Sequence, residues 1–199
     1  MKWIVITSPD FLLGEASVIR FLLQNGVDTV HLRKPCSQVS DCRTLLKDIP
    51  PDCRGSIVLH DHFELCEEFQ VRGIHLNARN RTIPHGFKGN LSCSCHSLEE
   101  VRIKKMEMDY VFLSPIFDSI SKQGYKGVFS ENVLRNAEGI IDAKVIALGG
   151  VTFSAIPWLQ SLNFGGAAFL GDVWERIATE GNAQLVKYME EGRRIMGKE

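Results

Sequence analysis

The chain has 199 residues, 44% of them hydrophobic, which suits one domain with a substantial core. Its 23 basic and 24 acidic residues nearly cancel, which argues against a nucleic-acid-binding or anionic-membrane-binding surface. The N-terminus lacks a signal-peptide pattern, and no apolar run reaches the roughly 18 residues of a membrane span, so we expect a cytoplasmic protein with reduced cysteines.

Short apolar segments alternate with longer amphipathic ones along the chain. The expected strands cover 3–7, 28–33, 56–61, 73–77, 91–95, 109–114, 144–150 and 165–171. The expected helices cover 15–26, 37–49, 62–70, 97–106, a segment near 130–139, 152–163 and the C-terminal region, with a break near Gly181. The segment RNRTIPHGFKG, between the fourth and fifth strands, is expected to be a loop.

The strands are short and nearly all apolar, as strands buried on both faces must be. Cys93 and Cys95 lie two residues apart in one of them, so both are expected on the same buried face. Eight strand–helix units in one domain favour an α/β fold, a single-domain (β/α)8 barrel over residues 1–199. A doubly wound open sheet is the alternative.

Polar residues gather where the expected strands end. In a (β/α)8 barrel these carboxyl ends carry the functional site. Here they supply His31, Arg33, Lys34, His60, Asp61, His62, His75, Asn77, Arg79, Asn80, Ser94, His96 and Ser114. Asp61 suits Mg²⁺, which prefers one or two carboxylates plus substrate oxygens. Side chains alternate along His60-Asp61-His62, so a zinc site made of this triplet is less favoured.

Two loops have the composition of anion sites. Gly149 and Gly150 follow the seventh strand, where glycine lets the backbone approach a phosphate closely. Ser119, Ser121 and Lys122 follow the sixth strand in SPIFDSISKQGYKG and supply hydroxyl donors and a positive charge. The alternative for each loop is a structural turn without a ligand.

The motifs occur in the order found in one known family. Successive strands contain or end in HLRK, HD, GIHLN, SCSCHS, DYVFLSPIFDSISK, ALGG and GGAAFLGDVW. Over almost its whole length the chain resembles the thiamin phosphate synthases. The resemblance implies a (β/α)8 barrel that acts as a transferase. Enzymes of this family join hydroxymethylpyrimidine pyrophosphate to thiazole phosphate and release pyrophosphate, with the help of Mg²⁺.

The resemblance also implies roles for particular residues. Arg33 and Lys122 would act on pyrophosphate, and Ser94 would lie near the reacting pyrimidine, so these three are the candidate catalytic residues. Asp61 and Asn80 occupy the two magnesium-ligand positions. The remaining candidates for substrate binding are His31, Lys34, His60, Ser119, Ser121, Gly149, Gly150, Leu170 and Gly171.

The chain departs from the family pattern mainly in the half that holds pyrophosphate and metal. His31 replaces a glutamine, His60 an asparagine and Asn80 an aspartate. Gly171 replaces a serine, and Pro35 a lysine for which Lys34 is the expected substitute. We therefore expect Mg²⁺ to bind weakly and together with substrate pyrophosphate. The expected partners are small phosphorylated substrates, with a homodimer left open.

Two other functions stay open at this point. The family has a sister group of thiazole tautomerases, which move a proton on thiazole carboxylate phosphate. Their catalytic histidine lies at the end of strand six, where this chain has Ser114. His31, His60 or His96 would then have to move the proton instead. The other alternative is a phosphate-ligand binder without catalytic activity.

Overall fold

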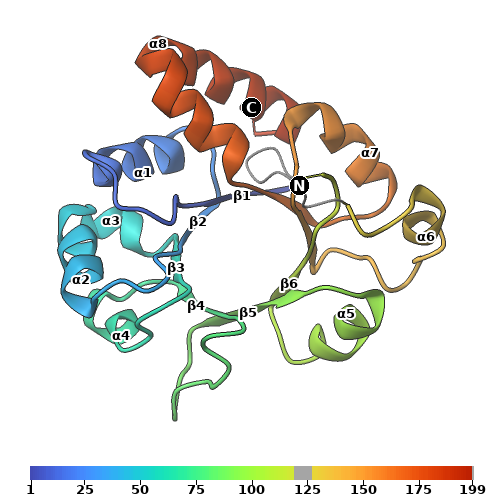
Figure 1. Cartoon of the computed structure of the whole chain (residues 1–199), viewed down its shortest axis with the longest axis horizontal. Coiled ribbons are helices and arrows are strands. Elements are labelled where there is room, and N and C mark those ends of the chain that lie inside the picture. The colour runs from blue at the N-terminus through green and yellow to red at the C-terminus, as the bar shows by residue number, and fades with distance from the viewer. Residues whose placement is uncertain (119–126, 199) are drawn as a thin grey trace.

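The computed structural model describes residues 1–118 and 127–198, and it has the expected architecture. Eight parallel strands close into a barrel in chain order, and helices surround it (Figure 1). The strands are β1 (Lys2–Ile6), β2 (Thr29–Leu32), β3 (Ile57–Leu59), β4 (Gly73–Leu76), β5 (Asn90–Cys95), β6 (Tyr110–Leu113), β7 (Val145–Leu148) and β8 (Gly166–Phe169). The (β/α)8 prediction is confirmed, and the open-sheet alternative is wrong.

The helices mostly follow the expected ranges. They are α1 (Glu15–Gln24), α2 (Val39–Asp48), α3 (Pro51–Arg54), α4 (Leu65–Phe69), α5 (Leu98–Lys104), α6 (Glu131–Arg135), α7 (Ile156–Ser161) and α8 (Gly171–Met196), with a 3-10 turn at Phe153–Ala155. Two details differ from the sequence expectation. Pro51 begins a short extra helix, because its fixed φ suits the first helical turn, and α8 continues through Gly181.

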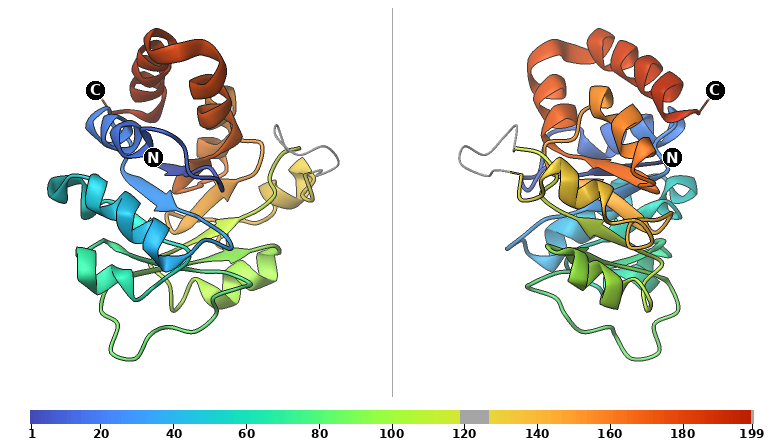
Figure 2. Two further views of the ribbon diagram at one scale, coloured as in Figure 1. Left: turned by 60° about the vertical axis from the view of Figure 1, so that its left-hand side comes forward. Right: turned by 90° about the vertical axis from the view of Figure 1, so that its right-hand side faces the viewer.

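The connection between β4 and β5 contains no helix, as expected. Residues 77–89 form a loop that hangs below the barrel in both views of Figure 2. On this side of the barrel α5 packs against β5 and β6. Ser97 begins α5 as expected, since its hydroxyl accepts the backbone N–H of Glu100 at 3.1 Å.

Two buried regions hold the barrel together. The larger lies between the strands and the helices, and it includes Cys93 and Cys95 on the same side of β5, as predicted. The smaller fills the barrel interior with Ile4, Ile6, Tyr110, Phe112, Ile146 and Ala168. Barrel interiors are usually aliphatic, but this one also contains fully or almost fully buried histidines.

In the described part of the chain, no helix has the length and apolarity needed to cross a membrane.

Candidate active site at the carboxyl ends of the strands

Asp61 and Asn80 lie together beyond β3 and β4, as their paired positions predict. The amide nitrogen of Asn80 donates to Asp61 Oδ1 at 3.1 Å and to the carbonyl of His60 at 2.9 Å. The Arg79 guanidinium binds the same carboxylate, with Nε 3.1 Å and Nη2 3.0 Å from Oδ1. The carboxylate is thus neutralised by a side chain from the adjacent loop.

This arrangement does not fit a preformed Mg²⁺ site. Mg²⁺ binds through carboxylate and other oxygen atoms. Here Asp61 is already paired with a cation, and Asn80 presents its amide N–H rather than its oxygen to the carboxylate. The two residues expected to hold the metal instead form a hydrogen-bonded cluster with Arg79.

Arg33 extends from the end of β2 toward the same cluster. Its backbone N–H donates to the Thr7 hydroxyl at 3.0 Å, which ties β2 to the end of β1. Burial and the nearby positive charge of Arg79 lower the pKa of its guanidinium, while Asp61 opposes the shift. Among residues 1–118 and 127–198, its guanidinium has no hydrogen-bond partner. It therefore remains available for an anion.

Lys34 differs from the sequence expectation. It is buried, and its ammonium group donates to both carboxylate oxygens of Glu15, at 2.6 and 2.7 Å, and to the carbonyls of Ser8 and Asp10. All three of its N–H donors are therefore engaged within the protein. Because side chains alternate in direction, Arg33 and Lys34, directly after β2, point to opposite sides. Lys34 therefore stabilises the contact with α1. It does not substitute for the missing lysine at the mouth of the barrel, the end formed by the carboxyl ends of the strands.

Gly149 and Gly150 allow the loops after β6 and β7 to touch. Both have positive φ, +98° and +62°. A Cβ on Gly150 would lie 2.1 Å from the carbonyl oxygen of Asp118, which only glycine avoids. Asp118 in turn accepts the backbone N–H of Gly127 at 2.8 Å. The expected anion-binding residues Ser119, Ser121 and Lys122 lie outside the described residues.

Leu170 and Gly171 form the start of α8, next to the end of β8. Asp172 follows in the first helical turn, and it is buried. Its carboxylate accepts hydrogen bonds from Tyr188 Oη at 2.8 Å and from Arg176 Nε at 3.2 Å. The Asp172 carboxylate, which would repel an anion at the N-terminus of α8, is therefore hydrogen-bonded to two other residues of the same helix.

His31 and His60 lie deeper than the rim positions that the sequence suggested. Each side chain is buried inside the barrel, where His31 Nδ1 is 2.8 Å from His60 Nε2. His75 joins them, and its ring stacks on that of His60 with 4.2 Å between centroids. Burial lowers the pKa of all three, that of His75 to about 3, so the rings are neutral at pH 7.

Ser94 lies near the end of β5, and His96 directly follows the strand. The Ser94 hydroxyl is 2.9 Å from His75 Nε2 and so faces the interior. His96 is exposed, and its Nδ1 donates to the backbone carbonyl of Ser114 at 3.0 Å. A histidine from β5 therefore occupies the end of β6.

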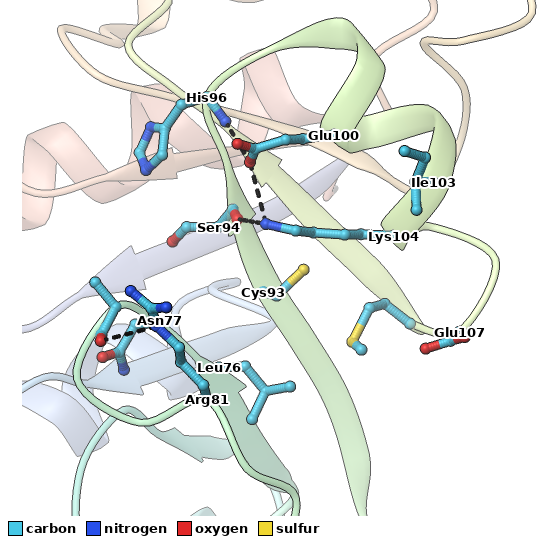
Figure 3. Close-up of a pocket in the computed structure, with 12 residues that line it drawn as sticks. Leu76, Asn77, Arg81, Cys93, Ser94, His96, Glu100, Ile103, Lys104 and Glu107 are labelled. Carbon is cyan, nitrogen blue, oxygen red and sulfur yellow. Dashed lines mark hydrogen bonds and ion pairs between the residues drawn. The ribbon is translucent and has the colours of Figure 1, made fainter.

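A pocket of about 560 Å³ lies on the outer side of β4 and β5, beside this rim. Figure 3 shows Lys104 extending across it, with its ammonium between Glu100 and the carbonyl of Ser94. Leu76 and Cys93 form its inner wall, and Arg81 borders it from the loop after β4. The pocket exists because residues 77–89 form a loop where other units carry a helix.

Three contributors to the site were not expected from the sequence: Tyr110, Ser92 and the pairing of Arg79 with Asp61. Tyr110 Oη is 2.6 Å from His31 Nε2, and Ser92 Oγ is 2.9 Å from His75 Nδ1. The alternation of side chains along β5 and β6 was the available signal, because it directs Ser92 and Ser94, and Tyr110 and Phe112, to the same interior. The pairing of Arg79 had no such signal.

The fold and the mouth define the class of protein: a (β/α)8 barrel with arginine, serine and glycine backbone gathered at the carboxyl ends of its strands. A sequence model described as "Thiamine monophosphate synthase" matches residues 4–173. The chain therefore belongs to the thiamine monophosphate synthase family.

Individual relatives agree with this assignment. A thiamine-phosphate synthase from Salinibacter ruber is 22% identical over 171 residues, covering 80% of this chain and 74% of the relative. The crystal structure of thiamine phosphate pyrophosphorylase from Bacteroides thetaiotaomicron is 39% identical, with a TM-score of 0.89 and coverage of 100% of this chain and 99% of that one. The structure of thiamine phosphate pyrophosphorylase from Pyrococcus furiosus, at 19% identity and a TM-score of 0.77, has the same fold.

Proposed function

We propose that this protein is a thiamin phosphate synthase-like transferase. It would join hydroxymethylpyrimidine pyrophosphate to thiazole phosphate and release pyrophosphate. Family membership supports the reaction type, and the B. thetaiotaomicron pyrophosphorylase, 39% identical over the whole chain, supports it further. The observation that carries the proposal is Arg33, an arginine at the end of β2 with no hydrogen-bond partner for its guanidinium in the described structure.

In this reaction the bond between the pyrimidine and pyrophosphate breaks, and the leaving group gains negative charge. Arg33 would bind it, because a guanidinium donates two parallel hydrogen bonds to phosphate oxygens. Positive charge held in place at the leaving group stabilises the transition state more than the bound substrate. Lys122, from outside the described residues, is proposed for the same task.

The second substrate would bind on the opposite side of the mouth. Gly150 holds a backbone conformation that brings the loops after β6 and β7 together, and its N–H is proposed to bind the thiazole phosphate. Gly149, Leu170 and Gly171 are proposed to line the same subsite, with Ser119 and Ser121. Ser94 is proposed to lie beneath the pyrimidine, where its hydroxyl already contacts His75.

Mg²⁺ stays a prediction from the family resemblance. Because Arg79 holds the Asp61 carboxylate, any Mg²⁺ would arrive together with pyrophosphate. We also propose small phosphorylated molecules as partners, a cytoplasmic location and a homodimer.

The direct test is to incubate the purified chain with both substrates, with and without Mg²⁺, and to measure thiamin phosphate and released pyrophosphate. Equal amounts of both products support the proposal. Binding of both substrates without product would leave the non-catalytic binder as the function.

Lys122→Met then tests the leaving-group role. The rate should fall by roughly 10²–10³, the scale for loss of one preorganised donor, while the affinity for thiazole phosphate changes less. If neither the rate nor the affinity changes, the anion-binding role of this loop is wrong.

A thiazole tautomerase is the second candidate, favoured by one observation. His96 Nδ1 contacts the carbonyl of Ser114, so an exposed imidazole reaches the strand-six end where the tautomerases carry their catalytic histidine. Neutral imidazole can accept and return a proton. Incubation with thiazole carboxylate phosphate alone distinguishes the two: proton exchange that His96→Gln abolishes would favour the tautomerase.

A further inference from the structure

Three histidines from adjacent strands converge inside the barrel. His31, His60 and His75 come from the ends of β2, β3 and β4, and one ring nitrogen of each lies within 4.8 Å of the others. His31 and His75 are fully buried, and His60 is 4% exposed. Three imidazoles so close together inside a barrel are more than packing requires, because each brings polar nitrogens that must find partners.

The outer nitrogens of two rings already have the partners that metal-binding histidines need. Such a histidine uses one nitrogen for the metal and donates the other N–H to a neighbour, which fixes its orientation. His31 Nε2 is 2.6 Å from Tyr110 Oη, and His75 Nδ1 is 2.9 Å from Ser92 Oγ. These contacts leave His31 Nδ1 and His75 Nε2 as the two nitrogens for a common ion. His75 Nε2 now contacts the Ser94 hydroxyl at 2.9 Å, so an ion would displace that hydroxyl, and the His75 ring would turn from its stacked position on His60 to direct its lone pair at the ion.

The third nitrogen is His60 Nε2, which now lies 2.8 Å from His31 Nδ1. A single proton joins these two nitrogens. An ion bound between them would take its place, and the proton would move to the other nitrogen of the ring that carries it, His31 Nε2 or His60 Nδ1, so no net proton is released from the neutral rings. Two ligands about 2.1 Å from a tetrahedral ion lie about 3.4 Å apart, so the pair need separate by only about half an ångström.

We propose that His31, His60 and His75 form a binding site for one divalent transition-metal ion of the zinc class. Neutral imidazole suits Zn²⁺, Co²⁺ and Ni²⁺, whereas Mg²⁺ takes oxygen ligands. The site is separate from the Asp61 cluster, and it does not depend on the synthase activity.

Three protein ligands leave the fourth tetrahedral position open. The Ser94 hydroxyl, which the ion would displace from His75 Nε2, lies beside that position and can hold a water there. Because Ser94 lies one residue before the end of β5 and His60 directly follows β3, the open position faces the substrate side of the barrel. The ion would therefore add positive charge beneath a site proposed to bind phosphorylated molecules.

Metal binding can be measured without any assay of activity. The full-length protein is stripped with a chelator and titrated with Co²⁺, whose d–d absorption reports tetrahedral geometry, and Zn²⁺ is then added in competition. We expect one ion per chain, intense visible bands, displacement by Zn²⁺ and a Kd for Zn²⁺ below ~1 μM. Absence of stoichiometric binding would overturn the proposal.

Two variants assign the ligands. His60→Gln removes a ligand from the least buried position and should weaken Zn²⁺ binding more than ~100-fold, beyond the range for an outer partner. Tyr110→Phe keeps the ring but removes the hydroxyl partner of His31, and it should weaken binding about 10- to 100-fold. Circular dichroism checks that each variant folds.

His85→Gln is the matched control, because His85 is an exposed histidine in the loop 77–89. It should leave the affinity unchanged. The six free cysteines are the competing ligands, and a thiolate–Co²⁺ charge-transfer band in the near ultraviolet would place the ion on them. That band, or an affinity that His60→Gln leaves intact, would refute the histidine site.

Discussion

The guanidinium of Arg79 pairs with the carboxylate of Asp61, with Nη2 3.0 Å from Oδ1. The pair brings a positive charge to the position where the family resemblance places a metal. Asn80 completes the cluster by donating to the same oxygen at 3.1 Å. An internal cation thus balances the single carboxylate, which explains how this mouth tolerates Asn80 in place of a second acidic residue.

Arg79→Gln should therefore tighten Mg²⁺ binding to the free protein. Removal of the competing charge frees the Asp61 carboxylate, and a partly exposed pair of this kind is worth about 1 kcal/mol, which corresponds to roughly a fivefold change in affinity. Calorimetric titration with Mg²⁺ measures it, and added pyrophosphate should tighten binding to both proteins. Arg81→Gln, two positions along the same loop, is the control. A tight stoichiometric Mg²⁺ site in the unmodified free protein would contradict this view of Arg79.

Lys34 provides a test of stability rather than ligand binding. Lys34→Met leaves the buried carboxylate of Glu15 without its cation, which should cost about 3–5 kcal/mol in the free energy of unfolding. Lys34→Met combined with Glu15→Leu should recover most of this loss, since the unpaired charge is gone. Urea unfolding gives both values. The exposed pair of Arg43 and Glu68 is the control, and Arg43→Met should change little. A variant that unfolds normally but binds pyrophosphate poorly would instead restore Lys34 as a ligand residue.

Gly150→Ala should disturb both stability and the thiazole phosphate subsite. The new Cβ would meet the carbonyl oxygen of Asp118 at 2.1 Å, at a φ of +62° that alanine disfavours. We expect a loss of about 1–3 kcal/mol in stability and weaker binding of thiazole phosphate. Gly139→Ala separates the causes, because Gly139 also has a positive φ, +79°, but has open space around it. It should lose about 1 kcal/mol and keep its ligand affinity. Equal behaviour of the two variants would mean that the close approach at Gly150 has no role in the site.

The cysteines should differ sharply in reactivity. Burial, reinforced by the charge of Glu67, raises the pKa of the Cys66 thiol to about 11, so almost no thiolate forms at pH 8. Iodoacetamide at pH 8 should therefore label exposed Cys36 and spare Cys66 in the folded protein. Mass spectrometry of the labelled peptides measures this, with urea-unfolded protein as the reference.

The raised pKa of Cys66 also determines how the stability of the protein changes at alkaline pH. Unfolded cysteine loses its proton near about 8.5, whereas folded Cys66 keeps it up to about 11. The unfolded state is thus favoured increasingly as pH rises between these values, and the contribution of Cys66 to stability falls there. Cys66→Ala should remove this part of the alkaline loss.

Local pattern and composition predicted the architecture. Eight short apolar strands alternating with amphipathic helices specify a (β/α)8 barrel, because every strand must be covered on both faces. The glycines at 149 and 150, the cap at Ser97 and the loop between β4 and β5 follow from local chemistry in the same way. Family motifs along the chain pointed to the reaction class. These features depend on neighbours in sequence, which the sequence displays directly.

Only the tertiary structure decided which polar strand-end residues face one another. Lys34 and Arg33 are adjacent, yet one pairs with Glu15 under α1 and the other reaches the mouth. Arg79 and Asp61 are 18 residues apart and meet at 3.0 Å. The depth of His31, His60 and His75 depends on the closure of the barrel, which brings three separate strands around one interior point. Distances between residues far apart in sequence come from the packing of the whole chain, and the local pattern of the sequence carries no direct record of them.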